Sequence, residues 1–353
     1  MTHQRPTEDI RVASLEPIVA PEDLKRVFPA PAGAYDMVRE ARRDITEALH
    51  GRGDRLVAIV GPCSIHDPDA ALDYARRLAD LACRVRDHVL VVMRMYFEKP
   101  RTTVGWKGLI SDPDLDGSNA ISKGLGVARR LLCEACSLGL PVGTETLSPT
   151  NPQYYADLIS WGGIGARTSQ SQTHREVVSG LSFPVGFKNA TTGHLDVAMD
   201  AMQSAGSAHT FTGISHDGRA AVIATRGNPH VHLVLRGADD GPNYEPEAVA
   251  EASRRLAGKG LPPGILVDCS HGNSHKDHAR QEVVLESVLD QVGAGDSPIF
   301  GFMLESFLEA GKQDIAGAAD GALVYGQSVT DACVDWDTTE RLVLRAAAAA
   351  ARR

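Results

Sequence analysis

Short apolar runs recur along this chain, and each ends at, or within a few residues of, a residue capable of chemistry. The eight runs are Leu56–Val60, Val89–Met93, Leu140–Val142, Ile164–Ala166, Pro184–Phe187, Val231–Leu235, Ile265–Val267 and Ile299–Leu304. Their length is typical of buried strands, and segments with a helical period of apolar positions lie among them. The predicted helices are Tyr35–Leu49, Asp69–Arg84, Ala120–Ser137, Ser169–Ser179, Leu195–Ala205, Pro246–Ala257, Lys276–Val292 and Thr338–Arg352. This rough alternation predicts parallel strands joined by right-handed crossovers.

Eight strands favour an α/β protein of the (β/α)8 TIM barrel type, and an open doubly wound sheet is the alternative that the pattern leaves open. In a barrel, the reactive residues at the strand tips would converge on the C-terminal face.

Two segments depart from the alternation. Residues 1–35 form a proline-rich, partly apolar arm, and Asp217-Gly218 within residues 209–225 signals an antiparallel β-hairpin. We therefore expect an arm and helix over 1–54, for oligomer or regulatory contact, and a catalytic barrel over 55–353.

Composition narrows the class of protein. The chain has 353 residues, of which 43% are hydrophobic and 23% charged, as in an ordinary globular enzyme. Its net charge of −9 argues against a nucleic-acid partner. No apolar stretch approaches the length of a membrane span, and Met1–Arg11 lacks the apolar part of a signal peptide. Six cysteines without regular spacing indicate a reducing compartment, so we expect a cytoplasmic protein.

Cations gather at the predicted strand tips despite the acidic background. They are Arg94, Lys99, Arg101, Arg167, Lys188 and Arg236. Arginine matches phosphate and carboxylate oxygens in pairs, and lysine adds a compact charge. Any one of them could be a surface ion pair, but six at one barrel mouth would repel each other unless anions bind there. The pattern indicates a multiply charged substrate or two phosphorylated ones.

A second set of tip residues suits a metal ion. Cys63, His271, Glu305 and Asp331 combine a thiol, an imidazole and two carboxylates. Such a set suits one borderline divalent ion, namely Mn²⁺, Fe²⁺, Co²⁺ or Zn²⁺. Their spacing matches no short metal motif, so the hypothesis depends on barrel geometry. The alternatives are a buried apolar role for Cys63 and a hydrogen-bonded loop role for His271.

Longer motifs carry a resemblance. They are Gly61–Pro68 (GPCSIHDP), Arg94–Thr103 (RMYFEKPRTT), Gly165–Thr168 (GART), Gly186–Asn189 (GFKN), Asp268–His271 (DCSH) and Ser328–Asp331 (SVTD). In this order they resemble the type I 3-deoxy-D-arabino-heptulosonate 7-phosphate (DAHP) synthases, and the similarity runs from about Asp9 to Leu344. The family has a (β/α)8 barrel. It condenses phosphoenolpyruvate with D-erythrose 4-phosphate and releases phosphate, the first step of the shikimate pathway to chorismate and the aromatic amino acids.

The resemblance implies roles for the residues at matching positions. Cys63, His271, Glu305 and Asp331 would be the metal ligands. Phosphoenolpyruvate would be held by Arg94, Lys99, Ala166, Arg167, Lys188 and Arg236, and the aldose phosphate by Arg101 and Thr102. The acid–base residues would be Lys99, as proton donor to the developing alkoxide, and Glu145, which would assist the attacking water.

The arm and the hairpin are candidates for subunit contact or regulation, and the alternative is that they are additions to the barrel without a function. In the family, the arm and hairpin help to form a feedback site for an aromatic amino acid. Gly213, the loop Ser215–Asp217 and Gln327 depart from the family pattern, so the sequence leaves the effector open. Because an apolar arm outside a barrel needs a surface to cover, we expect a homo-oligomer, either a dimer or a tetramer.

Three alternative functions differ from this one in what they require of the sequence. A sister synthase that uses arabinose 5-phosphate has Lys-Ala-Asn-Arg where this chain has Lys99-Pro100-Arg101-Thr102. A synthase of specialised metabolism could act on a related aldose phosphate with the same residues. A non-catalytic, effector-binding barrel should have lost metal ligands or cations, and none is missing here.

Overall fold

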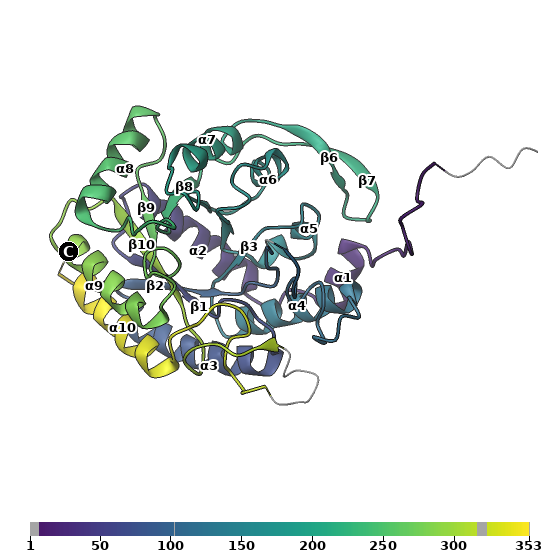
Figure 1. Ribbon diagram of the computed structural model, residues 1–353, viewed down its shortest axis with the longest axis horizontal. Coiled ribbons are helices and arrows are strands. Elements are labelled where there is room, and N and C mark those ends of the chain that lie inside the picture. The colour runs from purple at the N-terminus through teal and green to yellow at the C-terminus, as the bar shows by residue number, and fades with distance from the viewer. Residues whose placement is uncertain (1–6, 102, 316–322, 353) are drawn as a thin grey trace, which may run out of the picture.

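A closed barrel of parallel strands forms the centre of the molecule in the computed structural model, which describes residues 7–101, 103–315 and 323–352 (Figure 1). Its strands are β1 (Leu56–Gly61), β2 (Val89–Arg94), β3 (Val142–Glu145), β4 (Trp161–Ile164), β5 (Val185–Lys188), β8 (Val231–Leu235), β9 (Ile265–Asp268) and β10 (Ile299–Glu305). Around the barrel they follow the order β1-β10-β9-β8-β5-β4-β3-β2. The predicted TIM barrel is confirmed, and the open sheet is excluded because β1 pairs with both β2 and β10.

Alternation along the strands separates two apolar layers. In β1, Val57 and Ile59 belong to the cluster inside the barrel, whereas Leu56, Ala58 and Val60 pack outward against the helices. Successive side chains of a strand point to opposite faces, so a run of five apolar residues serves both layers. Ile45 and Leu49 join the interior cluster, so helix α2 (Ala34–Leu49) contributes side chains to the barrel core.

The third and fourth strands lie elsewhere than predicted. The expected runs Leu140–Val142 and Ile164–Ala166 were wrong in their bounds, since the strands are Val142–Glu145 and Trp161–Ile164. Because both strands contain glycine, a search for runs of apolar residues does not detect them. The indole of Trp161 occupies the space beside Gly143, Gly163 and Gly186, where a Cβ atom would lie 2.9–3.1 Å from its ring. Small residues in three strands thus accommodate one large side chain inside the barrel.

Helices follow most strands and cover the barrel. Besides α2, they are α3 (Pro68–Val85), α4 (Ile121–Ser137), α5 (Pro152–Tyr155), α6 (Gln172–Val178), α7 (Asp196–Ala205), α8 (Pro246–Gly258), α9 (Gln281–Gly293) and α10 (Trp336–Ala350), with 3-10 turns η1 (Ala156–Leu158) and η2 (His278–Arg280). The helix expected from Lys276 begins only at Gln281, because His275 and Lys276 have positive φ angles of 53° and 62°. Among the described helices, none is both long enough and apolar enough to cross a membrane.

The hairpin and arm form a separate region beside the barrel. Strands β6 (Thr210–Ile214) and β7 (Ala220–Ala224) pair antiparallel, as predicted, and lie between β5 and β8 in the sequence. Figure 1 shows the hairpin extending away from α7 toward α1 (Pro21–Val27), the first helix. The backbone amide of Glu22 donates to the carbonyl of His216 at 2.9 Å, so the arm contacts the hairpin turn. The division of the chain at residue 54 stays a prediction.

Candidate active site at the barrel mouth

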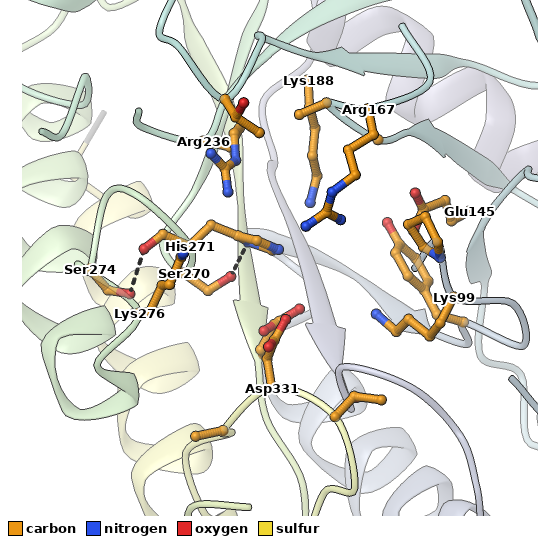
Figure 2. A pocket seen from close by; sticks show the side chains of 18 of the residues that line it. Lys99, Glu145, Arg167, Lys188, Arg236, Ser270, His271, Ser274, Lys276 and Asp331 are labelled. Carbon is orange, nitrogen blue, oxygen red and sulfur yellow. Dashed lines mark hydrogen bonds between the residues drawn. The ribbon is translucent and has the colours of Figure 1, made fainter. Parts of the chain in front are cut away.

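One cavity of about 310 Å³ lies at the carboxyl ends of the barrel strands. Most of the residues singled out from the sequence line it. They are Arg94, Lys99, Arg101, Glu145, Ala166, Arg167, Lys188, Arg236, His271, Glu305 and Asp331. Residues from distant parts of the chain thus converge on one space. In Figure 2, Lys188, Arg167 and Arg236 extend into it from one side, opposite Asp331.

Three of the four expected metal ligands meet below the cavity. The ligand atoms of Cys63, Glu305 and Asp331 lie within 4.8 Å of one another. Cys63 follows β1 and is fully buried, and Glu305 is the last residue of β10. Burial, followed by the charge of Glu305, raises the pKa of the Cys63 thiol to about 11. A thiol and two carboxylates at this separation are a donor set that fits a borderline divalent cation.

His271, the fourth expected ligand, lines the same cavity but lies outside that three-residue group. Its Nδ1 atom lies 2.6 Å from the Ser270 hydroxyl and 3.0 Å from Asp268 Oδ2. The nitrogen left for an ion is therefore Nε2. The backbone of His271 has a φ of 58°, a left-handed conformation that few residues other than glycine adopt.

Each of two buried cations at the mouth is paired with a carboxylate. Arg94 Nη2 donates to Glu305 at 2.8 Å, and its guanidinium lies 3.6 Å from the centre of the Tyr96 ring. Lys188 Nζ donates to Asp268 at 2.6 Å. Since an unpaired charge in a dry interior is costly, these partners stabilise the cations where they stand.

The remaining cations reach the cavity from positions that range from buried to exposed. Arg236 is 6% exposed, and burial lowers the pKa of its guanidinium. Arg167 is exposed at the rim, and so is Arg101, whose Nε donates to the carbonyl of Trp106 at 2.8 Å. Thr102, the other residue expected to hold the aldose phosphate, lies outside the described residues.

Lys99 and Glu145 have the surroundings expected of reactive groups. Lys99 Nζ donates to the Cys63 sulfur at 3.1 Å. Burial acts to lower the pKa of Lys99, but the Cys63 sulfur and the carboxylates of Glu305 and Glu145 outweigh it and raise that pKa. Glu145 ends β3, and its Oε1 atom lies 2.4 Å from the point where a Cβ of Gly165 would stand. Glycine at 165 therefore leaves room for the carboxylate.

Several cavity residues carried no role in the sequence interpretation. They are Tyr96, Thr191, Asp239, Ser270, Ser274, Lys276, His278 and Lys312. Tyr96 and Ser270 stand inside motifs that were recognised, so their position could have signalled them. Lys276 lies five residues beyond His271 in the same loop. Lys312 belongs to the segment between β10 and Asp331, where no pattern indicated a contact with the mouth.

The arrangement combines a wall of cations, formed by Lys188, Arg167 and Arg236, with a group of candidate metal ligands, formed by Cys63, Glu305 and Asp331. Lys188, Arg167 and Arg236 can neutralise phosphate and carboxylate groups, and the Cys63 group can hold an ion that polarises an oxygen. Lys99 lies between the two regions and can move a proton to a reacting atom. These features support the joining of an anionic substrate to a carbonyl compound.

Known proteins are similar to this chain in sequence and fold. The DAHP synthetase I family matches residues 34–344. A Salmonella typhimurium protein named phospho-2-dehydro-3-deoxyheptonate aldolase, Tyr-sensitive, is 49% identical over 335 residues, which cover 95% of this chain and 94% of that protein. A Corynebacterium glutamicum protein named phospho-2-dehydro-3-deoxyheptonate aldolase is 46% identical over 352 residues, with coverage of 98% and 95%. The structure of the protein of that name from Francisella tularensis SCHU S4 has a TM-score of 0.94 at 45% identity, covering 97% of this chain and 99% of that one.

Proposed function

Because the chain belongs to the DAHP synthetase I family and is a carbon–carbon bond-forming transferase, we propose that it condenses phosphoenolpyruvate with D-erythrose 4-phosphate. The reaction releases phosphate and depends on a divalent ion. One observation carries the proposal: the six cations and the Cys63–Glu305–Asp331 group share one barrel mouth. Two phosphorylated substrates need that positive charge, and an aldehyde acceptor needs an electrophilic activator.

The cations bind and orient the substrates in this mechanism. Arg94, Arg167, Lys188 and Arg236 hold the phosphate and carboxylate of phosphoenolpyruvate, and Arg101 with Thr102 holds the aldose phosphate. This orientation directs C3 of phosphoenolpyruvate at the aldehyde carbon, which is mainly a proximity effect. A divalent ion held by Cys63, His271, Glu305 and Asp331 would supply Lewis-acid polarisation of the aldehyde oxygen.

Lys99 and Glu145 handle protons and water. As the new carbon–carbon bond forms, Lys99, which its raised pKa keeps protonated, donates a proton to the developing alkoxide, and C2 gains positive character. Water then adds at C2 and loses a proton with the assistance of Glu145. The resulting C2 hydroxyl becomes the carbonyl as its proton is lost and the C2–O bond to phosphate breaks. Phosphate leaves with the electron pair of that bond.

The arm and hairpin serve regulation and assembly in this proposal. The Salmonella relative is named Tyr-sensitive, and a Schizosaccharomyces pombe relative that is 46% identical is named tyrosine-inhibited. We propose that an aromatic amino acid inhibits this enzyme through the arm and hairpin, and that the chain forms a homo-oligomer. A reducing cytoplasm would keep the Cys63 thiol available as a ligand.

The decisive experiment begins with chelator-stripped enzyme. Phosphoenolpyruvate and erythrose 4-phosphate are added with and without Mn²⁺, and loss of phosphoenolpyruvate is compared with release of phosphate. We expect equal, Mn²⁺-dependent amounts. Turnover only with another aldose phosphate would favour an enzyme of specialised metabolism, and absence of turnover with any aldehyde would refute the proposal.

A further inference from the structure

Asp268 is a fully buried carboxylate at the end of β9 that the mechanism above does not use. Four donors surround it. Lys188 Nζ lies 2.6 Å and His271 Nδ1 3.0 Å from Oδ2, while the amide and hydroxyl of Ser270 donate to Oδ1 at 3.0 and 2.8 Å. An ammonium group and three further donors around one buried carboxyl fit its ionised form inside the barrel wall.

One oxygen of Asp268 joins two parts of the mouth. Lys188 comes from β5 and belongs to the wall of cations, whereas His271 comes from the loop after β9 and lies on the cavity side toward Asp331 (Figure 2). A carboxylate at Nδ1 keeps the proton on that nitrogen, which leaves the lone pair of Nε2 for a metal ion. The same carboxylate directs the ammonium group of Lys188 and compensates its charge.

We infer that Asp268 is a positioning residue that orients both the ligand His271 and the substrate-binding Lys188, so that one carboxylate supports the metal and phosphoenolpyruvate sites. The inference rests on the proposed function for the roles of His271 and Lys188. Asp268 is not among the residues that line the cavity, so it acts on the substrates through neighbouring side chains, of which Lys188 and His271 contact its Oδ2 atom. Losing its charge should therefore weaken both binding events together.

The test substitutes Asp268→Asn, which keeps the shape and removes the charge. Mn²⁺ binding to stripped protein is measured without substrates, from the electron paramagnetic resonance signal of free Mn²⁺. The KM for phosphoenolpyruvate is measured at saturating Mn²⁺. We expect the Kd for Mn²⁺ to rise roughly 10–100-fold, as for other residues that support metal ligands, and KM to rise by about 10-fold or more. An unchanged Kd or an unchanged KM would overturn the inference.

Ser270→Ala is the matched control, because it removes a partner of His271 and Asp268 but leaves the contact between Asp268 and Lys188 intact. We expect it to weaken Mn²⁺ binding by less than about 10-fold and to leave the KM for phosphoenolpyruvate unchanged. If Asp268→Asn fails to fold in thermal unfolding, Ser270→Ala still tests the proposal. If the KM for phosphoenolpyruvate in Ser270→Ala rose as much as the Kd for Mn²⁺, Asp268 would not position His271 and Lys188 through separate contacts. If the proposed condensation were wrong, the wild-type protein would show no turnover. Mn²⁺ binding without substrates would still test the effect of Asp268 on the metal site.

Discussion

The barrel mouth differs from the arm and hairpin in the kind of side chain that it buries and the kind that it exposes. At the mouth, two cations are buried and paired, Arg94 with Glu305 and Lys188 with Asp268. In the other region, apolar side chains lie in solvent: Leu15 of the arm is 81% exposed and Val222 of β7 is 77% exposed. The barrel thus provides the pairing that its buried charges need, whereas the apolar accessory surface is left for contacts outside the barrel. Substitutions at the mouth should therefore change catalysis, and those on the hairpin should change assembly.

The largest effect is expected at the candidate metal ligands. Cys63→Ala removes the buried thiol beside Glu305 and Asp331, and we expect kcat/KM to fall at least about 10³-fold because a direct ligand is lost. Added Mn²⁺ should not restore activity. Steady-state assays over a Mn²⁺ series check this, with Cys136→Ala, a buried thiol on α4, as the control. Full activity in Cys63→Ala would remove Cys63 from the metal site.

A smaller effect is expected where a backbone position limits a side chain. Gly165→Ala places a methyl group 2.4 Å from the present position of Glu145 Oε1, so the carboxylate must move. We expect kcat to fall by roughly 10²-fold, the effect of displacing a catalytic group by about 1 Å. Gly241→Ala is the control, since nothing lies within 4 Å of its added carbon. Wild-type kcat in Gly165→Ala, with a retained fold, would argue against a role for the present position of Glu145.

These residues also show what sequence patterns can and cannot predict. The alternation of apolar runs and helical segments predicted the parallel strands and the barrel. The cavity residues could be predicted because each reactive residue is close in the chain to a strand tip. The pattern failed at Trp161–Ile164, where the glycines required by the Trp161 ring carry no apolar signal. The roles of Asp268 and Gly165 depend on distances between separate strands. A linear pattern does not contain those distances, so these roles became apparent only in the folded chain.

Glu98 provides a stability test of the buried region behind the mouth. Its carboxylate accepts from Asn151 Nδ2 at 2.9 Å, and burial raises its pKa from 4.5 to about 7. Because the folded-state pKa lies above the unfolded value, its contribution to stability is complete below about pH 4.5 and is lost as pH rises through 7. We expect the wild type to lose on the order of 3 kcal/mol of unfolding free energy from this group, a loss that Glu98→Gln avoids.

Urea unfolding of both proteins between pH 4 and 8 measures this difference directly. Glu251→Gln on α8 is the control for the loss of an exposed carboxylate and should give a curve parallel to the wild type. If Glu98→Gln also ran parallel to the wild type, Glu98 would not ionise with a raised pKa in the folded protein.

The smallest effect on catalysis is expected on the outer face of the hairpin, where Val222 pairs with Thr212. Val222→Asp leaves the opposite face, with Phe211 across from Ile223, unchanged, so the hairpin should still fold. A carboxylate buried between subunits would lack a partner, and we expect the dissociation constant of the oligomer to rise at least about 10-fold. Sedimentation velocity over a concentration series measures this, while kcat/KM should change less than about 2-fold at concentrations where the assembly persists. Val283→Asp, on the exposed face of α9, controls for added surface charge. An unchanged association in Val222→Asp would show that this apolar face is not covered by another copy, and the contrast between the two regions would then rest on the mouth alone.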